Sequence, residues 1–177
     1  MASRSLDDLT PEGKVAAEKM TQLCKDVELD ILIYCTLRPL EEQAKLYRQS
    51  RPWSEIKSKI LKFNNRGFNF LGDILDGVGP SSGPHVTNAG PGESWHNYGK
   101  AWDAVPLIGG KPAWSYTKAK NEWDGYGEAV RLAGAFWAGD WVGFREYPHA
   151  QIEKGGNPLK LYPPDKIREM LVKENLL

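Results

Sequence analysis

Several features that would assign a protein to a class are missing from this chain. In 177 residues there is no run of 18 apolar residues, and the N-terminal segment 1–8 lacks the apolar core of a secretion signal. The 23 basic and 23 acidic residues cancel, so net charge gives no reason to expect binding to nucleic acid or insertion into an anionic membrane. No repeat, linker or second module is visible. We therefore expect residues 1–177 to form a single domain, and we expect a monomer.

Cysteine and histidine are also scarce. The two cysteines, Cys24 and Cys35, are too few to argue for a disulfide framework or a cysteine metal site, so we expect two small buried side chains. The three histidines, His85, His96 and His149, could all lie on the surface or in satisfied hydrogen bonds. Their significance depends on the residues around them.

Periodicity indicates a mixed α and β chain. Thr10 as N-cap with Pro11 at the first helical position predicts a helix that ends between Cys24 and Asp26. Further helices are predicted from Pro39 to Gln49, over 117–137 and over 166–174, and residues 54–61 of the segment 52–75 are also predicted to be helical. Strands are predicted at 31–36 and 101–105. Residues 77–92, rich in Gly, Pro, Ser and Asn, predict a long loop, either a lip of a substrate groove or a tolerated insertion.

Two short segments hold an unusual set of metal ligands. The first reads Ser94-x-His96-x-x-Gly99-x-Ala101-x-Asp103, and the second reads Glu146-x-Pro148-His149. A catalytic zinc takes three protein ligands from His, Asp and Glu and keeps one position for water, and a further carboxylate beside that water serves as general base. The joint pattern favours such a centre, although the spacing of His96 and Asp103 alone is weak.

Pro148 constrains the second segment. It has no N–H and favours an extended Tyr147, so Glu146 and His149 cannot be an i, i+3 pair on a helix. On a plain strand the two side chains would face opposite ways. We therefore expect a bulge or a turn at Tyr147-Pro148.

These two motifs resemble the signature of VanY-like zinc peptidases, the family of D-alanyl-D-alanine carboxypeptidases and L-alanyl-D-glutamate endopeptidases that cut peptidoglycan. The resemblance extends over about residues 30–152. Its nearest branch is the L-alanyl-D-glutamate endopeptidases of phage lysins, on segments 86–89, 95–99, 137–141 and 148–151. It implies an α+β fold in which a small antiparallel sheet carries the zinc site and helices pack mainly on one face.

The resemblance also implies roles for particular residues. His96, Asp103 and His149 would hold one zinc ion per chain, and Glu146 would be the general base and acid. Arg38, at a strand-to-helix junction, and Ser94 would hold a substrate carboxylate or the developing oxyanion. Arg38 could equally be a structural ion-pair partner.

The implied function is zinc-dependent cleavage of the L-Ala–D-Glu bond in peptidoglycan stem peptides by a phage endolysin, a wall-lysing and antimicrobial enzyme. Without a signal peptide, such a lysin would be made in the host cytoplasm and reach murein after holin-mediated release. Two alternatives remain open, a D,D-carboxypeptidase or dipeptidase with the same metal site, and a non-catalytic zinc-binding module. Glu146 argues against the latter, because a module that only binds metal needs no carboxylate beside it.

Overall fold

The computed structural model describes all residues 1–177, and the chain divides into two compact units. The sheet unit consists of residues 2–37 and 99–154, and the helical unit consists of residue 1 with residues 38–98 and 155–177. Each unit therefore contains segments that are distant in the sequence.

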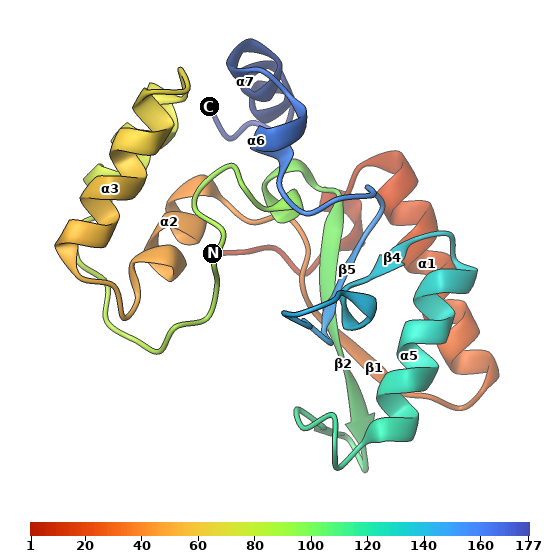
Figure 1. Ribbon diagram of the computed structural model, residues 1–177. Helices are drawn as coiled ribbons and strands as arrows, with labels where there is room; N and C mark the ends of the chain where they lie inside the picture. Colours follow the sequence, from red (N-terminus) through yellow and green to blue (C-terminus); the bar gives the residue numbers. More distant parts are fainter. The chain divides into compact units, whose positions relative to one another are not determined.

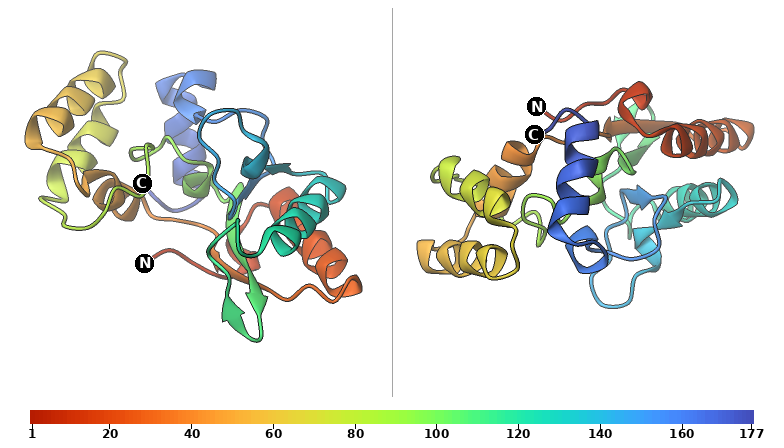
Figure 2. Two further views of the ribbon diagram at one scale, coloured as in Figure 1. Left: turned by 60° about the horizontal axis from the view of Figure 1, so that its bottom comes forward. Right: turned by 90° about the horizontal axis from the view of Figure 1, so that it is seen from above.

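The sheet unit is built on one small antiparallel sheet whose strands follow the order β1-β2-β5-β4 (Figure 1). A short strand, β3, pairs with the end of β2 as a hairpin, which Figure 2 shows at the far end of β2. The antiparallel α+β class expected from the sequence is confirmed. The strands are β1 (Ile31–Cys35), β2 (Ala101–Ile108), β3 (Lys111–Pro112), β4 (Phe136–Trp137) and β5 (His149–Gln151).

Two helices, α1 (Pro11–Asp26) and α5 (Lys120–Leu132), lie side by side over one face of this sheet (Figure 1). The side chain of Thr10 caps α1 by accepting from the Gly13 amide, as expected for an N-cap before Pro11. Trp102, Ala104 and Ala150 of the sheet are buried against the two helices. Because side chains alternate along a strand, the residues between them face the opposite side of the sheet. Short 3-10 helices at Leu6–Asp8 (η1) and Ala138–Asp140 (η3) complete the unit.

The expected helix over 117–137 is wrong at its C-terminal end. Helix α5 stops at Leu132, and Gly134 follows in the left-handed region with φ of 87°. Glycine adopts this conformation without a steric penalty and commonly terminates helices. The chain then forms β4, in which Trp137 pairs with Ala150. The aromatic pattern of the segment therefore continues from a helix into a strand.

The helical unit contains the remaining helices. Figure 2 shows α3 and α4 packed side by side, and the helix expected from Pro39 to Gln49 is confirmed to within one residue. The segment from 54 to 61 is part of a longer helix, and residues 78–94 contain no helix or strand, in agreement with the expected loop. The elements are α2 (Leu40–Arg48), α3 (Trp53–Asn64), α4 (Asn69–Gly77), η2 (Trp95–Tyr98), α6 (Pro158–Leu161) and α7 (Pro164–Lys173).

The core of the helical unit is aromatic and aliphatic. Each of its helices contributes at least one buried apolar side chain, and Trp95 lies edge-on to Tyr98 and Tyr162. The largest of these buried side chains are Trp95, Tyr98, Phe63, Phe68, Leu40, Ile56, Leu71 and Leu75.

The prediction for the two cysteines is also tested. Cys24 and Cys35 are both buried and form no disulfide, as expected. None of the helices is long and apolar enough to cross a lipid bilayer.

Candidate functional site

The face of the sheet opposite α1 and α5 carries a row of polar residues across three strands. Asp103 of β2 pairs with Cys35 of β1 on one side and with His149 of β5 on the other. The pairing with Cys35 follows an irregularity in β1 between Ile33 and Cys35, which leaves Tyr34 as an extra residue. The register of the strands therefore brings two predicted zinc ligands, Asp103 and His149, directly opposite each other.

The side chains of these two residues are in contact. His149 Nδ1 lies 3.1 Å from Asp103 Oδ1, and both residues are buried. Burial lowers the pKa of His149, but the hydrogen bond and charge of Asp103, together with the charge of Glu146, outweigh this effect and raise the pKa above its usual value. The negative charges of Asp103 and Glu146 therefore favour the protonated form of the His149 ring.

A tight turn leads into His149. The amide of His149 donates to the carbonyl of Glu146 at 3.1 Å, with Tyr147 and Pro148 as the central residues. This is the turn expected at Tyr147-Pro148, and that prediction is confirmed. Because the turn reverses the chain, Glu146 and His149 lie close together although they are not on a helix.

The carbonyl groups within this turn are held by the rest of the sheet unit. The Tyr147 carbonyl accepts from Trp137 Nε1 at 2.7 Å, and the Pro148 carbonyl accepts from the Ala104 amide and the Tyr126 hydroxyl, both at 3.0 Å. Burial raises the pKa of Tyr126 well above its usual range, so this hydroxyl remains a donor. Helix α5 and strands β2 and β4 thus fix the turn that carries Glu146.

Two further residues contact the row without having been assigned a role from the sequence. Gln151 Oε1 lies 3.0 Å from His149 Nε2, and the Trp141 ring lies 5.6 Å from the His149 ring. The signal for Gln151 was its spacing, since residues i and i+2 of a strand share a face. Cys35, expected to be an ordinary buried residue, also lies within 4.8 Å of an Asp103 carboxylate oxygen.

His96 belongs to the helical unit, where it lies in η2 and is 2% exposed. The segment around it is held by hydrogen bonds to the backbone. The Arg38 amide donates to the His96 carbonyl at 3.0 Å, and Asn97 Nδ2 donates to the Arg38 carbonyl at 2.8 Å. Asn97 Oδ1 accepts from the Gly92 amide at 2.9 Å, and the Tyr98 hydroxyl donates to the Gly92 carbonyl at 2.8 Å.

The two predicted substrate-binding residues also lie in the helical unit. Arg38 Nη1 donates to Gln43 Oε1 at 2.8 Å, and Gln43 Nε2 donates to the Ala89 carbonyl at 2.7 Å. Ser94 is half-buried, and its hydroxyl oxygen accepts from the His96 amide at 3.4 Å. Arg38, Ser94 and His96 are thus linked within this unit, and their role in substrate binding stays a prediction.

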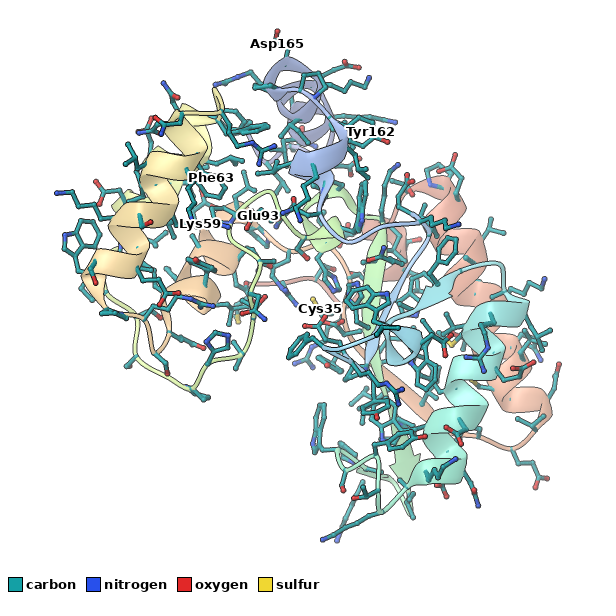
Figure 3. All side chains as sticks on the ribbon, in the orientation of Figure 1. Cys35, Lys59, Phe63, Glu93, Tyr162 and Asp165 are labelled. Atoms are coloured by element: carbon teal, nitrogen blue, oxygen red, sulfur yellow. The ribbon has the colours of Figure 1, made fainter.

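The long loop before η2 is tied down at several points within the helical unit. Arg51 Nη2 donates to the Thr87 carbonyl at 2.8 Å, and the Ser50 hydroxyl donates to the Gly83 carbonyl at 2.6 Å. Glu93 Oε2 accepts from the Gly90 amide at 2.8 Å and pairs with Lys59 of α3, as Figure 3 shows. These bonds give the loop a defined course.

The donor atoms of the sheet unit fit a zinc ion. An imidazole nitrogen and a carboxylate oxygen are the usual nitrogen and oxygen ligands of zinc. Two ligands of a tetrahedral zinc with bonds of about 2.0–2.2 Å lie about 3.3–3.6 Å apart. The 3.1 Å between His149 Nδ1 and Asp103 Oδ1 is close to that separation.

Comparisons with known proteins agree with the motifs. Residues 87–152 match the model of a family described as D-alanyl-D-alanine carboxypeptidase. The chain is 28% identical over 151 residues to the peptidoglycan L-alanyl-D-glutamate endopeptidase CwlK of Bacillus subtilis. The aligned region covers 82% of this chain and 74% of CwlK. The matched segment contains Ser94, His96, Asp103, Glu146 and His149.

Two solved structures are also similar to this chain. The L-Ala D-Glu endopeptidase ChiX of Serratia marcescens has a TM-score of 0.48 at 16% identity and covers 92% of each chain. The vancomycin resistance D,D-pentapeptidase VanY, solved in complex with Zn(II), has a TM-score of 0.48 at 10% identity and covers 93% of this chain and 78% of its own.

The resemblance to VanY-like zinc peptidases, predicted from two short motifs, is therefore confirmed by the family model and by the similarity to CwlK.

Proposed function

We propose that this protein is a zinc-dependent peptidoglycan peptidase that cleaves the L-Ala–D-Glu bond of stem peptides. The observation that carries the proposal is the pairing of Asp103 with His149 across β2 and β5, with Glu146 placed beside them by the turn at Tyr147-Pro148. Asp103 and His149, which are buried and face each other, supply two metal ligands. The nearby carboxylate of Glu146 supplies a group that can accept and donate a proton.

In the proposed centre, His96, Asp103 and His149 hold one zinc ion. When bound, zinc lowers the pKa of a water molecule and polarises the substrate carbonyl. Glu146 accepts the proton of the attacking water and later gives it to the leaving amine. The turn that carries Glu146 is bonded to β2, β4 and α5, so the backbone that carries this residue is held in place before substrate binds.

Arg38 and Ser94 are proposed to bind the substrate. The Arg38 guanidinium is oriented by Gln43, itself tied to the Ala89 carbonyl, and such an oriented cation suits a carboxylate of the stem peptide. The motif that contains Ser94 and His96 most resembles that of endopeptidases, and CwlK carries that activity in its name. These points favour the endopeptidase over the D,D-carboxypeptidase.

The experiment that tests the bond is a digest of purified murein, with the new termini identified by mass spectrometry. We expect free L-Ala carboxyl and D-Glu amino termini and little released D-Ala. Release of D-Ala as the main product, with stem peptides still attached to muramic acid, would establish the carboxypeptidase alternative. No new termini at all, with zinc bound, would favour the non-catalytic module.

We further propose that the enzyme acts as a phage endolysin, made in the host cytoplasm as a monomer and released to murein through holin pores. Expression in a bacterial host with and without a holin tests this role. The culture should lose turbidity only when both proteins are present. Lysis without a holin would show that the enzyme reaches murein by another route.

A further inference from the structure

We infer that Gln151 is a positioning residue that holds the His149 ring with Nδ1 directed to the metal. The inference rests on the proposed zinc centre. Gln151 is 1% exposed and lies two residues after His149 on β5, so both side chains are on the site face of the sheet. No role for Gln151 follows from the ligand spacing itself.

The orientation of the Gln151 amide is fixed by its second partner. Its Nε2 donates to the Glu153 carbonyl at 2.6 Å. A carbonyl oxygen can only accept, so the amide nitrogen of Gln151 must face Glu153 and the amide oxygen must face His149. That oxygen, Oε1, lies 3.0 Å from His149 Nε2.

This orientation determines the tautomer of His149. Because Gln151 Oε1 can only accept, His149 Nε2 must carry a hydrogen and donate it. A neutral imidazole carries one ring hydrogen, so Nδ1 then presents its lone pair. Nδ1 faces Asp103 Oδ1, which also presents lone pairs, at 3.1 Å. His149 Nδ1 and Asp103 Oδ1 can therefore bind the same cation. Metal-binding histidines usually donate the N–H of their other ring nitrogen to a neighbouring acceptor, as His149 Nε2 does to Gln151 Oε1.

The backbone of Gln151 is also held on both sides. Strand β5 lies between β2 and β4, and Gln151 pairs with Ala101 of β2 and with Phe136 of β4 (Figure 1). The Ile152 amide donates to the Lys100 carbonyl at 3.1 Å, and the Lys100 side chain pairs with Glu153. The acceptor that fixes the Gln151 amide is therefore part of the same bonded network, and the side chain has little freedom to turn over.

The direct test reads the position of the ring hydrogen on His149. In the full-length protein with ¹⁵N-labelled histidine, nuclear magnetic resonance should show a hydrogen on Nε2 with and without added zinc, and an unprotonated Nδ1 when zinc is bound. A hydrogen on Nδ1 in the zinc-loaded protein would overturn the inference. This reading does not require activity.

Variants test the consequence for zinc. Gln151→Leu removes the acceptor and should weaken zinc binding about 10- to 100-fold, as measured by competition with a chelator. Gln151→Glu keeps an oxygen that accepts from Nε2 and should retain both the tautomer and an affinity nearer that of the unchanged protein. Thr10→Val is the matched control, because it also removes a buried hydrogen bond, from the Gly13 amide, at the start of α1.

The outcomes separate the inference from the proposed function. If Gln151→Leu fails to fold, Gln151→Glu decides, because loss of the Nε2 hydrogen in that variant contradicts the inference. Unchanged zinc affinity in folded Gln151→Leu also contradicts it. If the unchanged protein binds no zinc and cuts no murein, the proposed function fails, yet a His149 Nε2 without a hydrogen in the zinc-free protein would still contradict the contact with Gln151. A zinc peptidase whose His149 carries its hydrogen on Nδ1 keeps the function and overturns the inference.

Discussion

The two units present their predicted site residues in different ways. In the sheet unit, Asp103 and His149 lie on one face of the sheet, while the hydrophobic core lies on the other face with α1 and α5. In the helical unit, His96 lies within the core itself, since the η2 residues Trp95, Asn97 and Tyr98 are each at most 1% exposed. In the sheet unit the predicted site residues and the core lie on opposite faces of the sheet. In the helical unit the predicted site residue His96 lies among the core residues.

This difference predicts how substitutions will act. A change on the site face of the sheet should alter chemistry with little effect on stability, because strand pairing and the helix-covered face remain. A change in η2 should alter both chemistry and stability, because the same hydrogen bonds hold the fold and the proposed ligand His96. The predictions that follow test this contrast, from the largest expected effect to the smallest.

Asp103→Asn should have the largest effect. The substitution keeps the shape of the side chain but removes the negative charge that favours a divalent cation. We expect zinc content close to zero by metal analysis and no measurable murein hydrolysis, while the unfolding midpoint measured in chelator changes little. Asp140→Asn, an isosteric change at an exposed partner of Arg131, should retain one zinc per chain. Full zinc occupancy in Asp103→Asn would contradict the ligand assignment.

Glu146→Gln should keep the metal and lose turnover. Glu146 is half-buried, and the turn that carries it is held through backbone carbonyls, which the substitution leaves in place. Loss of a general acid and base lowers the rate by about 10²- to 10⁴-fold. Glu128→Gln on the exposed side of α5 is the control and should hydrolyse murein normally. If zinc were lost together with activity, Glu146 would be a fourth ligand and the site structural in type.

Asn97→Ala tests the helical unit. It removes a side chain that donates to the partly buried Arg38 carbonyl and accepts from the buried Gly92 amide, and it leaves both backbone groups without these partners. An unsatisfied buried group costs about 1–3 kcal/mol, so denaturant unfolding should show a loss of at least about 2 kcal/mol. Asn88→Ala, in the exposed part of the preceding loop, should cost less than about 0.5 kcal/mol. Equal stability of the two variants would remove the contrast between the units.

The same contrast accounts for what the sequence could predict. The strand around Asp103 and the turn at Pro148 follow from local rules, alternation along a strand and the missing N–H of proline, and both are confirmed. The end of α5 was missed because Phe136 and Trp137 continue the helical spacing, although Gly134 stood in the sequence as a stop signal.

Other parts depend on contacts that are distant in sequence. The hydrogen bond from Asn97 to the Arg38 carbonyl joins residues 59 positions apart, and no local pattern indicates it. Gln151 was visible as a residue of the motif, but its meaning depends on the Glu153 carbonyl, which fixes the direction of the amide only in the folded chain. The proposed ligands could therefore be named from the sequence, whereas the groups that orient them could not.

The smallest expected effect distinguishes the two cysteines of the sheet unit. Cys24 of α1 lies on the core side, where burial raises the pKa of its thiol from 9.0 to about 11. Below pH 9 the thiol is neutral in both states. Between pH 9 and about 11 the unfolded chain loses this proton while the folded chain keeps it, so ionisation favours unfolding and stability falls as pH rises. The slope from this one group is less than about 1.4 kcal/mol per pH unit.

Since buried tyrosines act in the same direction, the test is the difference between the unchanged protein and Cys24→Ala in denaturant unfolding across this range. The variant should be less stable at neutral pH because it leaves a cavity, and its stability should fall less steeply above pH 9. If the stability of the two proteins fell in parallel with pH, burial would not hold the Cys24 thiol neutral. That result would contradict the distinction between an apolar core face of the sheet and the polar face that carries Cys35 and Asp103.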